Sequence, residues 1–242
     1  MSAPGVLLDT LSLDLALAQS IAAAITAGTA AAVSDGSFDA TLQRGTSAFV
    51  LAPSPDSPLQ NCITGGNRTT GLDADQSAYR SELAGALAVL STVDLLVSYF
   101  GISSGAITIA FDGKAALDAS SHPSGLASIT VSQPCFDYLQ VIYNRLASLP
   151  ITVHWRWVRG HQRERGFTDV DWWGEMNDVA DTLAKDFLAT SYRGTPHTTL
   201  PSPTLLHEKW TISILGDKHS RFSSTLCYNA VLEPDIVSYW QD

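Results

Sequence analysis

The sequence predicts an α/β domain built on a mixed five-stranded sheet with flanking helices, in which an antiparallel meander precedes parallel strands. The first observation is a set of three short apolar runs within residues 31–66, separated by turn-forming segments, which is typical of a meander. The second is the alternation of later apolar runs with helical patterns, which favours parallel strands joined by crossover helices. The chain has 242 residues, 45% of them hydrophobic, which is enough for one sizeable core.

Each predicted element has a local reason in the sequence. The meander strands are expected at 31–37, 45–52 and 59–66, with the break "PSPDSP" before the third. A long helix is expected at 73–101, because leucines such as Leu83, Leu87 and Leu90 repeat at helical spacing, with Asp73 or Asp75 as its N-cap. The later elements are expected as strand 106–112, helix 135–148, strand 151–161 and helix 175–190.

The chain divides into three predicted parts. Residues 1–30 are expected to form an N-terminal helical extension, 31–190 the main domain, and 191–242 a linker with a C-terminal extension of unknown role. The Ala-rich run within 15–34 could serve as a membrane or signal segment. It has no basic leader and is mostly alanine, so a helix that packs on the domain and ends near Gly28 is favoured. We therefore expect no membrane partner and an intracellular location, cytoplasmic or nuclear, without secretion.

The overall charge and the cysteines exclude two classes of protein. The formal net charge is −10, so the protein has no general surface for polyanions, and any nucleic acid would be bound at a local site. The three cysteines lie far apart without a CxxC pair, which excludes a zinc knuckle or a disulfide framework and fits a reducing compartment.

Four acidic residues lie where predicted elements end or begin. Asp35 follows the first apolar run, Asp112 closes the fourth, and Glu82 and Asp181 lie on the first long helix and the last one. Each has an ordinary alternative: an Asp-Gly turn for the two strand-end aspartates, solvent exposure for Glu82, and an i,i+4 pair with Lys185 for Asp181. The alternatives remain open for each residue taken alone.

Taken together, the four acids indicate a metal site. If the first and fourth strands are parallel neighbours, Asp35 and Asp112 meet at their C-terminal ends, where open α/β sheets place ligands. Helices that cross the sheet can present Glu82 and Asp181 at the same place. Four carboxylates repel one another unless cations lie between them, and hard oxygen ligands favour Mg²⁺ or Mn²⁺. Two such ions suit phosphodiester cleavage.

Five blocks of the sequence resemble, in order, the motifs of ribonuclease H domains: "VSDGSF", "AYRSELAGALAVL", "IAFDGKAAL", "WVRGH" and "NDVADTLAK". The resemblance covers about 31–190 and implies a ribonuclease H-like catalytic domain of the kind fused to reverse transcriptases. It implies that Asp35, Glu82, Asp112 and Asp181 bind two Mg²⁺ ions, with Mn²⁺ as an alternative. In this arrangement Asp35 bridges both ions, Asp181 shares the water-activating ion, and the other two acids hold the second.

The resemblance also implies a role for His161, which matches a family histidine on a mobile loop that assists turnover. In the family this histidine usually lies about ten residues before the last aspartate, whereas here 20 residues separate His161 from Asp181. The extra stretch "QRERGFTDVDWWGE" is expected to form a longer loop, in which Trp172 and Trp173 are expected to be exposed. His154, on the preceding strand, is expected to be structural.

The substrate side departs from the family pattern. An Asn or Gln pair usually precedes the helix glutamate, but Ala78 and Tyr79 stand there. The candidate substrate-binding residues are Gly36, Ser37, Gln76, Arg80 and Asn177. The basic handle that grips hybrid in many cellular members is absent, since no Lys or Arg lies between Lys114 and Arg145. The family resemblance implies an RNA/DNA hybrid as substrate, while the departure at Ala78 and Tyr79 leaves selectivity for hybrid open. The missing handle implies a reverse transcriptase polymerase domain as a partner that binds the hybrid.

The remaining basic residues cluster in "RWVRGHQRER", 156–165, which is either a solvated loop or a phosphate contact. Trp155 and Trp157 share a strand face with Ile151 and Val153, so core packing is favoured over base stacking. The leading hypothesis is a two-metal endoribonuclease that cuts the RNA strand of RNA/DNA hybrids. The alternatives are a non-catalytic scaffold or tether of the same fold, and a nuclease of the same fold that cuts DNA.

Overall fold

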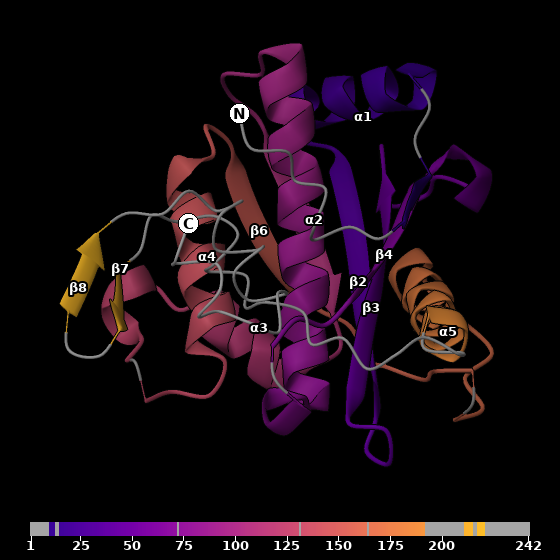
Figure 1. Ribbon diagram of the computed structural model, residues 1–242. Helices are drawn as coiled ribbons and strands as arrows, with labels where there is room; N and C mark the ends of the chain where they lie inside the picture. Colours follow the sequence, from indigo (N-terminus) through magenta and orange to yellow (C-terminus); the bar gives the residue numbers. More distant parts are fainter. Residues whose placement is uncertain are drawn as a thin grey trace.

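A six-stranded mixed sheet forms the centre of the computed structural model, with strand order β1-β4-β3-β2-β5-β6 (Figure 1). Strands β2, β3 and β4 form the antiparallel meander, and β2, β5 and β6 are parallel neighbours. The strands are β1 (Thr10–Ser12), β2 (Ala30–Asp39), β3 (Arg44–Ala52), β4 (Ile63–Arg68), β5 (Ala106–Phe111) and β6 (Thr152–Trp157). The predicted five-stranded mixed sheet is therefore confirmed, and the three-residue β1 adds an edge strand that was not predicted.

The structure describes residues 10–12, 15–71, 73–130, 132–163, 165–191, 211–214 and 217–220. Most of the predicted C-terminal linker and extension lies outside these residues. Two short strands within it, β7 (Thr211–Ile214) and β8 (Asp217–Ser220), pair with each other in antiparallel fashion. The division of the chain at residues 30 and 190 stays a prediction.

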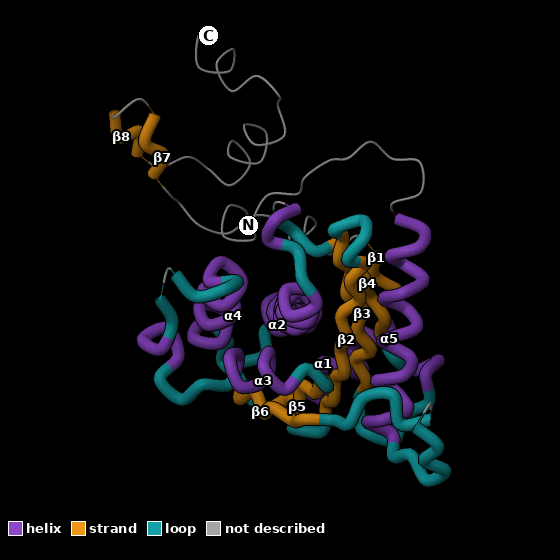
Figure 2. Tube along the Cα trace, turned by 90° about the horizontal axis from the view of Figure 1, so that it is seen from below, coloured by secondary structure: helices purple, strands orange, loops and turns teal. Residues whose placement is uncertain are grey.

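Helices cover both faces of the sheet (Figure 2). On one face lie α1 (Leu15–Ala27), α2 (Ala78–Phe100), α3 (Lys114–Ser120) and α4 (Phe136–Ser148), and on the other lies α5 (Trp172–Ser191). Alternate residues of β2 serve the two faces, because side chains alternate along a strand. Ala30 and Ala32 pack in the α2-side core, whereas Ala31 and Val33 pack against α5.

The long helix α2 is the central core helix. It is capped by Ser77, whose hydroxyl accepts a hydrogen bond from Arg80 N at 3.1 Å, and it ends at Gly101 in a left-handed conformation. Ser77, rather than the predicted Asp73 or Asp75, is the N-cap. The helix is long and apolar enough to cross a membrane by composition, but 72% of its most apolar 18-residue window is buried inside the fold. Its hydrophobicity is therefore accounted for by the core.

Helix α1 ends just before Gly28 and packs in the same core as α2 through Ile21 and Ile25. The prediction of a packing helix that ends near Gly28 is confirmed. Helix α5 begins three residues earlier than predicted. Asp171 caps it by accepting a hydrogen bond from Gly174 N, so Trp172 and Trp173 are helical, not part of the loop. Trp173 is buried, which corrects the expectation of exposure.

Candidate metal centre

Asp35 lies in the middle of β2, at the point where its parallel partner β5 ends. The last pair between these strands is Val33 with Ala110, and two residues further along each chain come Asp35 and Asp112. A strand end was predicted at Asp35, but β2 continues to Asp39. Beyond Val33, β3 is its only partner among the described strands. The predicted meeting of Asp35 and Asp112 is thus set by the register of β2 with β5.

Glu82 reaches Asp35 because helix α2 touches strand β2 at Gly36. A Cβ added to Gly36 would lie 2.6 Å from the backbone of Ser81 and Glu82, so only glycine permits this approach. Gly113 makes a similar contact further along, since its Cβ would lie 3.0 Å from Glu82 Cγ. Two glycines therefore place the Glu82 carboxylate beside the middle of β2 and the end of β5.

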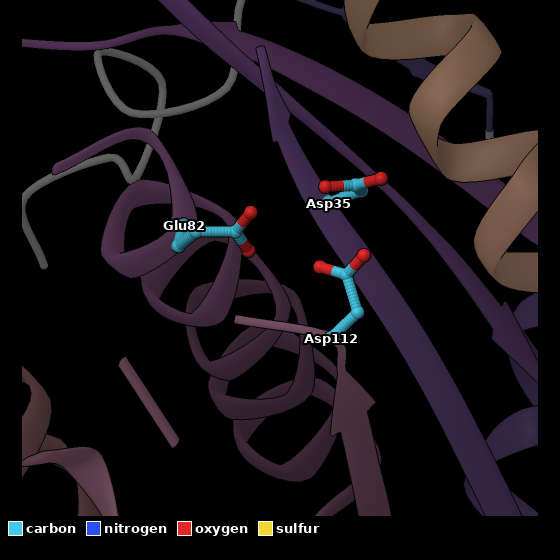
Figure 3. A group of neighbouring side chains, drawn as sticks. All are labelled: Asp35, Glu82 and Asp112. Carbon is cyan, nitrogen blue, oxygen red and sulfur yellow. The ribbon is translucent and has the colours of Figure 1, made fainter. Parts of the chain in front are cut away.

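The carboxylates of Asp35, Glu82 and Asp112 form one group. Each offers an oxygen atom, and the three oxygen atoms lie within 4.8 Å of one another. Figure 3 shows the three side chains turned toward a common point, with Glu82 coming from α2 and the two aspartates from the sheet side. Of the four acids predicted to meet, the structure brings these three together directly.

The electrostatics of this group are those of crowded, buried acids. Burial, followed by repulsion from Asp112 and Asp181, raises the pKa of Asp35 from 3.8 to about 7. Burial and repulsion from Asp35 and Asp112 raise the pKa of Glu82 well above its usual value. Burial also raises the pKa of Asp112, although His161 opposes the rise. These side chains are poorly stabilised as anions by the protein alone.

Asp181 stands outside the group of three, on α5. Its Oδ2 atom accepts a hydrogen bond from Lys185 Nζ at 2.7 Å and lies 3.9 Å from His161 Nδ1. It is close enough to raise the pKa of both Asp35 and Asp112. From the sequence, Asp181 could either pair with Lys185 at i,i+4 or lie beside the acid group. The structure shows both.

His161 lies beside the acids despite its distance from Asp181 in sequence. It adopts a positive φ of 51°, and the loop after it folds back through hydrogen bonds from Arg165 N to His161 O and from Phe167 N to Gln162 O. The preceding Gly160 presses against the Asp112 carboxylate so closely that a Cβ there would overlap it. The longer loop thus leaves the histidine at the edge of the site.

Two buried polar groups at this site have atoms without a hydrogen-bond partner among the described residues, and their oxygen atoms suit a cation. Glu82 Oε2 is buried without a hydrogen-bond partner among the described residues. Asn177 on α5 is 1% exposed, and neither atom of its amide makes a hydrogen bond of good geometry within the described chain, although the amide stabilises the Asp112 carboxylate. Unpaired buried oxygens are costly, and bound cations or ordered water commonly satisfy them. The residues therefore fit a divalent metal with oxygen ligands.

Arg80, a predicted substrate-binding residue, is structural instead. Its side chain is 3% exposed, donates to Thr70 O at 2.7 Å, pairs with Asp137 at 2.5 Å and stacks on the Tyr138 ring. The Arg80 guanidinium therefore forms an ion pair that joins α2 to α4. A buried guanidinium in this arrangement offers nothing to nucleic acid, which corrects the sequence assignment.

The other predicted substrate-binding residues have mixed positions. Gln76 is buried, and its amide nitrogen donates to the backbone oxygens of Thr69 and Thr70, so it also serves the fold. Ser37 is buried in β2 opposite Thr46, and Gly36 faces α2. Asn177 lies at the acids. The substrate roles of Ser37, Gly36 and Asn177 stay predictions.

The contact at Gly36 gives a first testable prediction. Gly36→Ala places a methyl group against the α2 backbone, so we expect a loss of about 2–3 kcal/mol in the free energy of unfolding, as for other overpacked cores. Displacement of α2 also moves Glu82, so metal affinity should fall. Urea denaturation and calorimetric titration with Mn²⁺ measure the two effects.

The matched control is Gly85→Ala, on the face of α2 that packs against β2. There the added Cβ would meet Ser34 Cβ at 3.1 Å, a side-chain contact that can relax, and alanine favours the helix. We expect its unfolding free energy to stay within about 1 kcal/mol of the parent. Equal effects of the two substitutions would contradict the close approach at Gly36.

The fold was compared with known proteins. No family model matches the chain, and no curated protein matches it in sequence. Among solved structures it is similar to RNase H1 from the halophilic archaeon Halobacterium salinarum, with 17% identity over 67% of this chain and 98% of that chain and a TM-score of 0.43. It is also similar to the N-terminal RNase H domain of Rv2228c from Mycobacterium tuberculosis, with 14% identity over 67% and 95% of the two chains and a TM-score of 0.43.

The domain has the ribonuclease H-like fold that the sequence predicts. The fold follows from the strand order, the parallel and antiparallel pairs, and the helices on both faces of this chain's own sheet. At identities of 14–17%, the chemistry of this ribonuclease H-like domain has to be judged from its own residues.

Proposed function

We propose that this protein is a two-metal endoribonuclease that hydrolyses the RNA strand of RNA/DNA hybrids. The observation that carries the proposal is the group formed by Asp35, Glu82 and Asp112 at the edge of the sheet, with oxygen atoms within 4.8 Å of one another. Asp35 is buried, Glu82 and Asp112 are partly buried, the pKa of each is raised, and Glu82 Oε2 has no hydrogen-bond partner among the described residues. Such a group is unfavourable for stability and suits cation binding.

Each residue has a part in the proposed reaction. Two divalent ions, Mg²⁺ in preference to Mn²⁺, would supply activation of the attacking water and stabilisation of the leaving oxygen. Asp35, whose carboxylate is influenced by Glu82, Asp112 and Asp181, would hold both ions, while Asp181, approached by Lys185 and His161, would hold one. The backbone amide of Gly36 donates to Asp35 Oδ1 at 2.7 Å and fixes its orientation. The products expected from the family resemblance are a 3′-hydroxyl and a 5′-phosphate.

The charge distribution supports a partner protein. The chain carries 24 acidic and 14 basic residues, and the segment from Lys114 to Arg145 has no basic residue between its ends. Affinity for a polyanion comes largely from Lys and Arg, so this domain alone should bind hybrid weakly. We propose that a reverse transcriptase polymerase domain supplies the missing contacts to the hybrid. We also propose an intracellular location for the complex.

The decisive assay compares labelled RNA/DNA hybrid, double-stranded DNA and double-stranded RNA, each with Mg²⁺ or Mn²⁺ and each with EDTA. The proposal predicts cleavage of hybrid in the RNA strand, dependent on metal. Cleavage of DNA alone would instead indicate a DNA nuclease of the same fold. Metal binding without cleavage of any substrate, with or without a polymerase partner, would indicate a scaffold.

His161→Ala is expected to slow turnover without eliminating it. The imidazole lies 3.9 Å from Asp181 and is half-exposed, so it can assist proton or product movement, but it is not one of the three grouped acids. We expect kcat to fall about 100-fold, the lower end of the range for a general acid-base group. Steady-state kinetics on hybrid give the value, with His154→Ala, on the exposed face of β6, as the control. Unchanged kcat would make His161 a structural residue.

A further inference from the structure

The end of β6 and the loop after it carry four arginines within residues 156–165, and three of them differ in what they contact. Arg156 pairs with Asp171 at 3.5 Å and stacks on the Trp173 ring. Arg163 pairs with Glu175 at 2.7 Å. Arg159 has no carboxylate partner among the described residues, and its guanidinium lies over the Phe167 ring, 5.2 Å from the centroid. Arg159 is therefore an available positive charge in a strongly acidic protein.

Two large aromatic side chains are exposed in the same region. Trp157 is 47% exposed and Phe167 is 43% exposed, whereas Trp155, two residues before Trp157 on β6, packs edge-to-face against Phe111. Core packing was expected for both strand tryptophans and is confirmed only for Trp155. Exposure of a large aromatic ring is costly in water, so a group of such rings beside a site is informative.

Trp157 is fixed directly to the acid group. Its indole Nε1 donates a hydrogen bond to the backbone oxygen of Asp112 at 2.9 Å, which holds the ring at the end of β5. Arg159 follows two residues later, immediately before Gly160, whose backbone touches the Asp112 carboxylate. Trp157 and the backbone of Gly160 therefore adjoin Asp112, where a phosphate would be cleaved, and Arg159, which lies over the Phe167 ring, is the residue next to Gly160.

We infer that Trp157, Arg159 and Phe167 form a nucleotide-binding surface that holds the substrate strand beside the acid group. Bases stack on exposed aromatic rings irrespective of sequence, and an arginine held on a ring can contact phosphate while it also stacks. The occupant is a nucleotide of the polynucleotide strand next to the scissile phosphate, because the surface begins at Asp112 itself. This inference rests on the proposed nuclease function and adds a local grip to a domain with no basic handle.

The test measures binding of a fluorescently labelled RNA/DNA hybrid by anisotropy, in an Asp35→Asn background that prevents turnover. Trp157→Ala and Phe167→Ala should each weaken binding about 5- to 100-fold, the range for loss of base stacking. Arg159→Gln should weaken binding and reduce the slope of log affinity against log salt by about one. In the active enzyme the same three substitutions should raise KM more than they lower kcat.

Three matched variants separate binding from structural effects. Trp157→Phe keeps a ring but removes the hydrogen bond to Asp112, so it should retain most of the affinity. Arg163→Gln removes the same charge from the same loop, but from a guanidinium already paired with Glu175, and should leave the salt slope nearly unchanged. Tyr99→Ala removes an exposed aromatic ring at the far end of α2, 71% exposed, and should have no effect.

The results are unambiguous in either direction. If the hybrid binds with parental affinity to the Trp157→Ala, Arg159→Gln and Phe167→Ala variants, the surface is not a binding site, and the proposed cleavage is unaffected by that result. If these variants change only the melting temperature, or if Trp157→Phe is as impaired as Trp157→Ala, their role is structural and the inference is wrong. Failure of the parent to cleave hybrid would refute the proposed function, while the binding experiment would still decide the surface.

Discussion

Asp35→Asn is expected to abolish metal-dependent cleavage of hybrid. The Asp35 carboxylate is the one that interacts with Glu82, Asp112 and Asp181 together. Replacing it by a neutral amide removes a negative oxygen from any shared cation. Loss of even a single electrostatic group at a reacting centre costs about 10²–10³ in rate, and loss of a metal ligand should cost at least that much.

The measurement is single-turnover cleavage of labelled hybrid with saturating Mg²⁺, together with calorimetric titration of Mn²⁺. The control is Asp39→Asn, which makes the same change four residues further along β2. The Asp39 carboxylate accepts hydrogen bonds from the turn amides of Thr41 and Leu42. It should keep near-parental cleavage and metal affinity. Activity retained in Asp35→Asn would show that the metal assignment is wrong.

The second large effect concerns the stability of the metal-free protein. The folded-state pKa of Asp35 is about 7, above its ordinary value of 3.8, so the folded state binds a proton more tightly than the unfolded chain. The free energy of unfolding should therefore fall as pH rises from about 4 to about 7 and level off above that. A difference of three units at about 1.4 kcal/mol each corresponds to about 4 kcal/mol.

The contribution of Asp35 is isolated by the difference between the parent and Asp35→Asn. In EDTA, the variant should be about as stable as the parent near pH 4 and more stable by up to about 4 kcal/mol above pH 7, measured by urea denaturation. Mg²⁺ should cancel much of this difference at pH 7.5 by binding to the parent. Asp118→Asn, at an exposed carboxylate on α3, should show no such pH-dependent difference. A flat profile for Asp35→Asn would mean that the carboxylate is not crowded.

The acid group could be predicted from the sequence because short apolar runs mark where strands lose a partner. The run that ends at Val33 and the run that ends at Phe111 are parallel neighbours, so the acids after them had to meet. What the run could not show is that β2 continues past Asp35 to Asp39, because β3 remains as a partner after β5 has ended. The end of an apolar run shows where a strand loses one neighbouring strand, whereas the length of the strand depends on both of its neighbours.

Residues with long polar side chains were predicted less well. The sequence cannot tell whether an arginine near a helix start faces solvent or an acid on another helix, and Arg80 meets Asp137 of α4, 57 residues later. Similarly, alternation along β6 placed Trp155 and Trp157 on one face, but it could not show that only the first is covered. Such contacts depend on distant elements, which local spacing does not record.

The contact between Gly160 and the Asp112 carboxylate has a consequence for rates. With the His161 loop in place, the backbone at residue 160 packs against the Asp112 carboxylate and limits its rotation. A carboxylate that cannot rotate cannot easily release what it holds, so exchange of a bound ion should wait for the loop to move, on the microsecond to millisecond scale typical of such motions. The loop would then set the residence time of the ion, even though it contributes no ligand from that glycine.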